Sequence, residues 1–307
     1  MRIVDTDAER YIEHCKKNEL SPSTIKAYRL DILHFWKFID VATDLKSFIV
    51  NDGVISSYVK SISEKFAPRT AKRKSASISA FFEYLCFEGV LNDNPMKNIK
   101  TSFGIKAEAP KTLPIDIIEK LFKTAWNEFK SSHTNYSKVV ALRNVSIMEL
   151  IFTTGFRVSE LCNLKYFDVI LDAGEITVNG KGKRGRTVII DNDNVLNTLR
   201  LYISHNKIES EYFFYNRHNN SRFSEQSVRD VIERLAKKSG IPFRISPNTI
   251  RHTFIDLLLN ENFNIENAEN VLGHSSLYST YISPKIKSET RNRIPSHINP
   301  RRKINYD

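Results

Sequence analysis

The stretch from Lys100 to Pro114, KTSFGIKAEAPKTLP, interrupts the apolar pattern of the chain and divides it. It combines charged residues, glycine and proline without a repeating apolar position, which is typical of an extended linker. A chain of 307 residues is also long enough for two domains of ordinary size. We therefore predict a first domain over residues 1–100, a linker over 101–112 and a second domain over 113–307.

The first domain carries two strong helical patterns. Ser21 precedes Pro22, as in a helix whose capping residue is followed by proline at the first helical position. A second helix is predicted to begin at Ala67-Pro68 and to end at Gly89. The apolar residues that recur on one face of the earlier helix are Ile25, Tyr28, Ile32, Phe35, Trp36 and Ile39.

Basic residues gather in the first turns of the second helix, where the helix dipole disfavours cations. This arrangement costs folding energy unless a partner such as a phosphate backbone uses it, and a solvated basic face is the alternative. The formal net charge of +11 suits a nucleic acid or an anionic membrane surface. Both predicted domains are basic, as a clamp that binds nucleic acid from two sides requires. The residues of this cluster are Arg69, Lys72, Arg73 and Lys74.

Several classes of protein do not fit the sequence. It has no apolar run of membrane-spanning length and no signal-peptide pattern, so we expect a cytoplasmic protein. The cysteines Cys15, Cys86 and Cys162 are odd in number and not clustered, which argues against a disulfide framework and a zinc site. We therefore expect reduced, packed cysteines and no metal.

A β-hairpin with a basic tip is predicted in the second domain. The stretch EITVNGKGKRGRTVII alternates, turns between Gly180 and Gly185, and alternates again. ATP binding is not expected, because a P-loop needs Gly-Lys-Ser/Thr followed by a helix. The tip instead offers a lysine, Lys181 or Lys183, for insertion into a groove; a solvated basic tip is the alternative. Helices are predicted around residues 115–130, 143–154, 224–239, 247–260 and 265–272.

Two arginines lie on predicted helices of the same domain. In TTGFRVSELCNL, Arg157 begins a helix and could present its planar fork to a phosphate; a surface pair with Glu160 is the alternative. In SPNTIRHTF, Arg251 lies on a helix that Ser246 begins. The adjacent His252 is turned roughly 100° away, so we predict a packed histidine.

The order of these motifs is more specific than any one of them. Arginine in TGFRVSEL, lysine in GKGKRGRTV, arginine in SPNTIRHTF, histidine in LGHSS and then tyrosine form a series that resembles the tyrosine recombinases, especially their Xer-like and Cre-like members. The resemblance covers nearly the whole chain. It implies a mainly α (α+β) fold with two domains. The first is a SAM-like helical core-binding domain, and the second is a mixed helical catalytic domain with a small antiparallel sheet. The two domains are expected to form a C-shaped clamp around DNA.

The resemblance also implies site-specific DNA strand cleavage and rejoining without a cofactor. The hydroxyl of Tyr281 attacks a phosphodiester and forms a 3′-phosphotyrosyl link. Arg157 and Arg251 hold the non-bridging oxygens, the task that metal ions perform in other phosphoryl-transfer enzymes. His274 donates a further hydrogen bond to the phosphate, and Lys181 is the general acid for the leaving 5′-oxygen.

Two positions depart from the family pattern. Asn248 replaces the usual histidine of H-x-x-R, and because an amide cannot accept a proton, it cannot be the general base. Deprotonation of the tyrosine then depends on the positive field of the arginines, on His274 or on water. Tyr281 lies seven residues after His274, two fewer than is common in the family, which a shortened loop explains. Tyr278 and Tyr306 are the alternative nucleophiles.

The partner that the resemblance implies is double-stranded DNA with inverted-repeat arms, bound by a homotetramer on two sites, with room for a partner recombinase or accessory protein. We expect the basic tail from Lys285 onward either to dock on a neighbouring protomer or to fray. A DNA-binding homologue without turnover and a type IB topoisomerase are the alternatives; the Xer-like first domain argues against the latter. The candidate DNA-binding residues are Lys26, Arg29, Arg69, Lys72, Arg73, Lys74, Lys183 and Arg184.

Overall fold

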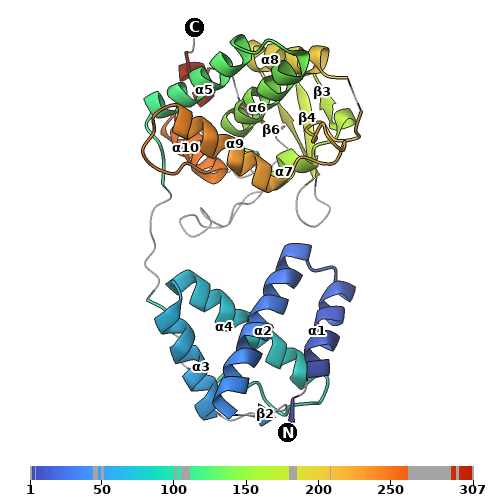
Figure 1. Cartoon of the computed structure of the whole chain (residues 1–307), viewed down its shortest axis with the longest axis vertical. Helices are drawn as coiled ribbons and strands as arrows, with labels where there is room; N and C mark the ends of the chain where they lie inside the picture. The colour runs from blue at the N-terminus through green and yellow to red at the C-terminus, as the bar shows by residue number, and fades with distance from the viewer. Residues whose placement is uncertain are drawn as a thin grey trace. The chain divides into compact units, whose positions relative to one another are not determined.

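The computed structural model describes residues 2–3, 5–43, 48–49, 52–99, 102–104, 111–179, 185–207, 209–261, 292–294 and 297–305. The chain divides into two compact units, residues 1–108 and 109–307 (Figure 1). The division falls inside the stretch 101–112, for which the sequence predicts a linker. Each unit has its own hydrophobic core.

The first unit is helical. Helix α1 (Asp5–Lys17) and α4 (Pro68–Phe87) both pack on α2 (Pro22–Thr43), and α3 (Asp52–Lys65) packs on α4 (Figure 1). Two short antiparallel strands, β1 (Arg2–Ile3) and β2 (Phe48–Ile49), complete it. The predicted helix starts at Pro22 and Pro68 are confirmed. Gly89 follows α4 with a φ of 71°, in the left-handed region that favours glycine.

Helix α6 (Asn135–Thr154) forms the centre of the second unit, where it contacts α5 (Ile115–Lys130), α8 (Asp193–His205) and α10 (Pro247–Asn260) (Figure 1). It begins earlier than predicted, because Thr134 and Ser137 form a reciprocal capping box ahead of the apolar pattern. The remaining helical elements of the unit are α7 (Val158–Asn163), α9 (Glu225–Lys238) and the 3₁₀ turns η1 (Tyr166–Asp168) and η2 (Pro300–Lys303).

A four-stranded sheet of order β3-β4-β5-β6 packs beside these helices. Strand β4 (Glu175–Asn179) pairs antiparallel with β3 (Val169–Ile170) and with β5 (Gly185–Ile189), so the predicted hairpin is confirmed. Its tip, residues 180–184, lies outside the described residues. Strand β6 (Asn292–Arg293) pairs parallel with β5. The predicted antiparallel sheet is therefore right for three strands, while the fourth comes from a distant segment that no hairpin pattern reveals.

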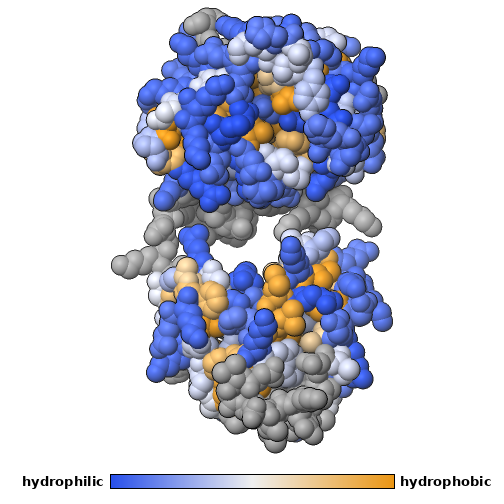
Figure 2. Space-filling view, viewed as in Figure 1, coloured by the Kyte–Doolittle hydropathy of each residue, from blue (hydrophilic) through white to orange (hydrophobic). Residues whose placement is uncertain are grey.

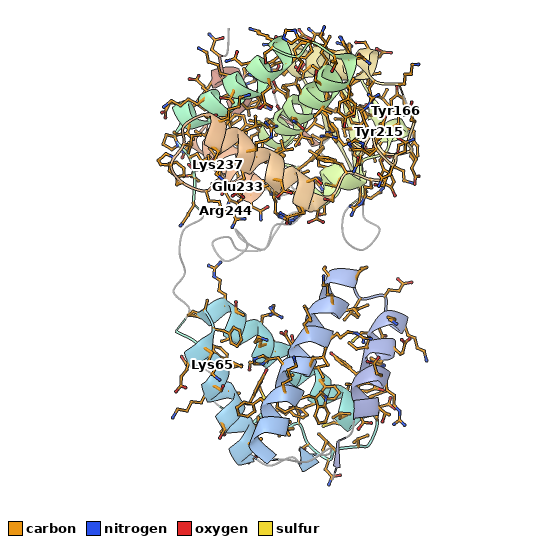
Figure 3. All side chains as sticks on the ribbon, in the orientation of Figure 1. Lys65, Tyr166, Tyr215, Glu233, Lys237 and Arg244 are labelled. Atoms are coloured by element: carbon orange, nitrogen blue, oxygen red, sulfur yellow. The ribbon has the colours of Figure 1, made fainter. Side chains whose placement is uncertain are left out.

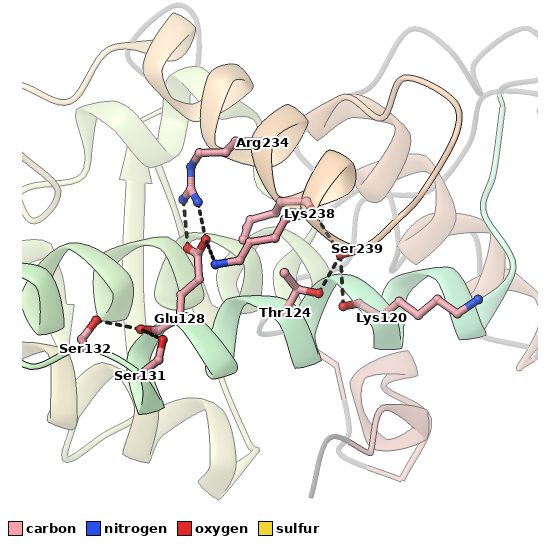
Figure 4. A network of polar contacts seen from close by, with 9 residues as sticks. Lys120, Thr124, Glu128, Ser131, Ser132, Arg234, Lys238 and Ser239 are labelled. Atoms are coloured by element: carbon pink, nitrogen blue, oxygen red, sulfur yellow. Dashed lines mark hydrogen bonds and ion pairs between the residues drawn. The ribbon is translucent and has the colours of Figure 1, made fainter.

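A polar network joins α9 to α5 (Figure 4). The carboxylate of Glu128 on α5 accepts hydrogen bonds from Arg234 at 3.0 Å and from Lys238 at 3.1 Å. The hydroxyl of Ser239, which follows α9, lies 2.7 Å from that of Thr124. The network holds the end of α9, and thereby the start of the segment that leads to α10.

The segment 297–305 packs on α6 of its own chain. Arg301 has a side-chain exposure of 1% and donates to the carboxylate of Glu149. The side-chain amide of Asn299 donates to the backbone carbonyl oxygen of Thr153 at 3.0 Å. The expectation of a frayed basic terminus is therefore wrong for this segment, because the side chains of Asn299 and Arg301 are buried and bonded within the unit.

The surface that faces the viewer in Figure 2 is mostly hydrophilic on the second unit and carries apolar side chains over α2 on the first. Leu30 and Leu33 of α2 are about half exposed. Among the described helices, none combines the length and the apolar character that crossing a bilayer requires.

Candidate active site

The turn between α6 and α7 positions the first predicted site arginine. Helix α6 ends at Gly155, which has a φ of 63°, and the buried Phe156 follows it. Glycine favours this left-handed conformation because it has no Cβ atom. Arg157 is the capping residue of α7. The arginine thus projects from a tight turn that two buried helices fix in place.

Helix α10 positions the second arginine. The hydroxyl of Ser246 accepts a hydrogen bond from the backbone N–H of Thr249 at 3.1 Å, which caps the helix, and proline occupies the first helical position. Arg251 lies one turn into the helix, is buried, and donates through Nη1 to the backbone carbonyl oxygen of Gly155. This bond joins α10 to the turn that carries Arg157.

The carboxylate of Glu160 connects the first arginine to a third one. Oε1 of Glu160 accepts from Nη1 of Arg157 at 2.9 Å and from Nη1 of Arg186 at 2.7 Å. Oε2 accepts from the backbone N–H of Arg157 at 2.8 Å and from Nη2 of Arg186 at 3.0 Å. The Arg157–Glu160 pair is therefore real, but the alternative of a surface pair is wrong, because the glutamate side chain is only 4% exposed.

The site has more positive than negative charge. Burial is the main cause that lowers the pKa of Arg251 to about 10, and the neighbouring charge of Arg157 lowers it further. Burial alone would raise the pKa of Glu160, but the hydrogen bonds and charge of Arg186, with those of Arg157, outweigh burial and lower it. Three guanidinium groups and one carboxylate leave an excess of two positive charges, which suits a phosphate whose negative charge grows during reaction.

Asn248 and His252 lie close to Arg251 on α10 and differ in their exposure. Asn248 is exposed on the first turn of α10, three residues before Arg251 and hence on the same side of the helix. His252 is half-buried, and burial together with the charge of Arg251 lowers its pKa. In the described part of the chain, no three His, Cys, Asp or Glu side chains are grouped so that they could hold a metal ion.

Five predicted site residues lie outside the described residues. The structure thus brings Arg157 and Arg251 together and leaves the placement of the others as a prediction. These five are Lys181, Lys183, Arg184, His274 and Tyr281; the alternative tyrosines Tyr278 and Tyr306 lie outside as well.

The predicted DNA-binding cluster of the first unit is only partly on the surface. Asp31 on α2 is buried and accepts hydrogen bonds from Arg73 and from Lys74, the latter at 3.2 Å. The ammonium of Lys74 also lies 4.8 Å from the ring centroid of Phe66, and its side chain is 9% exposed. Lys74 faces α2, and its burial beside Asp31 and Phe66 argues against the predicted contact with DNA, which stays a prediction. The exposed residues among those predicted to bind DNA from the first unit are Lys26, Arg29, Arg69, Lys72 and Arg73.

Two groups were missed by reasoning from the sequence. Arg186 lies inside a motif that was recognised, but no spacing rule connects a strand residue to Glu160 on a distant helix. Exposed basic residues also lie on and after α9: Lys237 is in its last turn, and Arg244, labelled with Glu233 in Figure 3, pairs with this glutamate at 3.7 Å. In the sequence, these residues are indicated only by a basic residue shortly before the helix that carries Arg251.

Solved structures share this architecture. XerH site-specific recombinase bound to palindromic difH substrate, in a post-cleavage complex, aligns with a TM-score of 0.69 and 22% identity over 89% of this chain and 79% of that one. A lambda integrase(75–356) dimer bound to a COC' core site aligns with a TM-score of 0.68 and 19% identity over 94% of this chain and 100% of that one. At this level of identity, the similarity establishes the fold.

Sequence comparison establishes the family. A model described as "Phage integrase family" matches residues 116–283, and one described as "Phage integrase, N-terminal SAM-like domain" matches residues 8–89. A "Tyrosine recombinase" of Agathobacter rectalis is 35% identical over 100% of both chains. A "Tyrosine recombinase XerC" of Thermodesulfovibrio yellowstonii is 32% identical over 89% of both. Together with the arginine site, these matches show that the chain belongs to the phage integrase family of tyrosine recombinases.

Proposed function

We propose that this site-specific recombinase exchanges DNA strands at sites with inverted-repeat arms, with Tyr281 as its nucleophile. The observation behind the proposal is that Arg157 and Arg251 lie in one site. Arg251 donates to the carbonyl oxygen of Gly155, and Arg157 pairs with Glu160 just after the same turn. Two arginines with an excess of positive charge can hold the non-bridging oxygens of a phosphodiester and stabilise the charge that develops on them.

Each step of the reaction has a candidate residue. The oxygen of Tyr281 forms a bond to phosphorus while the bond to the 5′-oxygen breaks, and Lys181 gives that oxygen a proton. The 5′-hydroxyl of another strand then attacks the phosphotyrosine, so the bond energy is conserved. His274 and Asn248 donate hydrogen bonds to the phosphate. The proton of the tyrosine passes to His274 or to water, because the amide of Asn248 cannot accept it.

DNA binding in this proposal involves both units. The exposed cations of the first unit, such as Arg69 and Lys72, contact phosphates and position the protein on the duplex. The second unit, which carries the arginine site, acts at the scissile phosphate. A lambda integrase tetramer bound to a Holliday junction, which shares the fold, supports a tetramer on two DNA sites. Integration, excision, transposition and dimer resolution are the tasks that such a reaction serves.

A covalent trap tests the proposal. DNA that binds the protein is first isolated from the source genome and sequenced, and a duplex of that site is then nicked so that the cleaved strand is lost. We expect a protein–DNA adduct with the wild type and with Tyr278→Phe, and none with Tyr281→Phe. An adduct that survives Tyr281→Phe would exclude this nucleophile. The absence of any wild-type adduct would instead favour a DNA-binding protein without turnover.

A further inference from the structure

Arg186, like Arg157 and Arg251, is bound in the site by direct hydrogen bonds. Its side chain is 8% exposed, and both of its terminal nitrogens bind Glu160, at 2.7 and 3.0 Å. The guanidinium carbon also lies 5.7 Å from the ring centroid of Phe156, in the turn before Arg157. Arg186 therefore contacts the structure that supports the phosphate-binding arginines from the side of the sheet.

The pairing of β5 with β4 determines the face of the sheet on which the Arg186 side chain lies. Arg186 is the second residue of β5 and lies opposite Val178 of β4. The next residue, Thr187, points to the other face, is exposed, and bonds across the strands to Thr177 at 2.9 Å. The two neighbours thus differ in role: one reaches the α7 carboxylate, while the other stabilises only the hairpin.

We propose that Arg186 is a positioning residue that fixes Glu160 and, through it, Arg157. This inference rests on the proposed function. Each oxygen of Glu160 accepts one bond from Arg186 and one from Arg157, so the position of Arg186 determines where the carboxylate lies. The carboxylate in turn holds both the backbone N–H and the guanidinium of Arg157. Arg157 keeps 35% of its side chain exposed, which leaves surface for a phosphate.

Charge balance gives Arg186 a second effect. With Arg157 as its only cationic partner, a buried carboxylate would draw that guanidinium into a full ion pair and weaken its contact with phosphate. Arg186 supplies a bidentate partner of its own, and its rigid fork fits the two carboxylate oxygens. Lysine at this position would keep the charge but lose one of the two bonds.

Kinetics on two substrates tests the proposal. The first is the nicked duplex with an ordinary scissile phosphodiester, and the second carries a methylphosphonate there, which lacks one negatively charged oxygen. On the phosphodiester we expect Arg186→Gln to lower the rate of adduct formation about 10- to 100-fold, and Arg186→Lys to lower it less. On the methylphosphonate the deficit should shrink, because Arg157 has less charge to neutralise.

Three controls separate positioning from damage to the fold. Thr187→Ala on the same strand and the exposed Arg200→Gln on α8 should keep the wild-type rate on both substrates. The DNA affinity and thermal stability of the Arg186 variants are measured alongside, so that a variant that fails to fold is recognised. If Arg186→Gln fails to fold, the rate of Arg186→Lys decides the test. A wild-type rate in both Arg186 variants, or an equal deficit on both substrates, overturns the proposal. If the wild type itself forms no adduct, the proposed function fails first.

Discussion

Arg301 donates to both carboxylate oxygens of Glu149, at 2.5 and 2.9 Å, although 152 positions separate the two residues. Both side chains are almost fully buried, and the guanidinium also lies 5.2 Å from the ring centroid of Phe122. Arg301 is therefore part of the core of the second unit, because it neutralises a buried carboxylate in the second half of α6.

Removal of one partner of this pair should be strongly destabilising. Arg301→Ala removes the guanidinium that binds both oxygens of this buried carboxylate, and we expect a loss of about 3–5 kcal/mol in the free energy of unfolding. Arg302→Ala is the matched control, since this neighbour is 44% exposed and pairs with Glu261 at 2.8 Å; its loss should stay below about 1 kcal/mol. Urea unfolding measures both, and equal losses would contradict the assigned role of Arg301.

The lowered pKa of Glu160 predicts an acid-sensitive fold. Its folded pKa lies below the ordinary value of 4.5, so the pair stabilises the protein above that pH, and the stabilisation is lost as the pH falls through the folded value. Melting temperatures between pH 7 and pH 3 should therefore drop less steeply for Glu160→Gln than for the wild type. Glu211→Gln, which alters an exposed pair with Lys165, serves as the control. Parallel curves for Glu160→Gln and the wild type would refute the prediction.

Two lysines that lie two positions apart on α4 should behave differently. Lys72 is exposed, so Lys72→Ala should weaken DNA binding at all sequences and reduce the salt dependence by about one charge, without loss of stability. Lys74→Ala removes a donor to the buried Asp31 and should cost about 1–3 kcal/mol of stability. Binding isotherms at several salt concentrations, with thermal melts, measure both effects. The same binding defect in the two variants would show that Lys74 also contacts DNA.

Asn248 provides a test of proton transfer. Histidine at this exposed position of α10 could accept the proton of the nucleophile, which an amide cannot. We expect Asn248→His to cleave faster near neutral pH and to have a flatter pH profile than the wild type. The comparison uses single-turnover cleavage of the same nicked duplex between pH 6 and pH 9. Identical rates and profiles would indicate that residue 248 takes no part in deprotonation.

Local patterns predicted α2, α4, α5, α9, α10 and the hairpin correctly, because capping residues, proline and apolar periodicity act over a few positions. They did not reveal α1, α3 and α8, and the helix predicted at 265–272 lies outside the described residues. Ser21, Pro22 and Gly89 mark helix ends in this way. The ordered motifs also predicted that Arg157 and Arg251 belong to one site. The contacts of Glu160 and Lys74 could not be predicted, because the burial of a charged residue depends on which distant element covers it.

The same limit applies to residues that pair across long distances in the chain. Arg186 with Glu160, Arg301 with Glu149, and the parallel strand β6 all join segments whose encounter depends on the tertiary fold. A sequence pattern indicates that a residue can form an ion pair, but not with which partner. The roles of Lys181, His274 and Tyr281 stay predictions from the family pattern.

The pairing of β6 with β5 also affects how the protein behaves in purification. Strand β6 pairs with Val188 and Ile189 at the end of β5, and thereby covers backbone groups that would otherwise lie at an open sheet edge. Open edges pair readily with other chains and lead to aggregation. A shortened protein that ends before Asn292 would expose this edge and lose Arg301 as well, so it should accumulate as insoluble material rather than as a trimmed catalytic fragment.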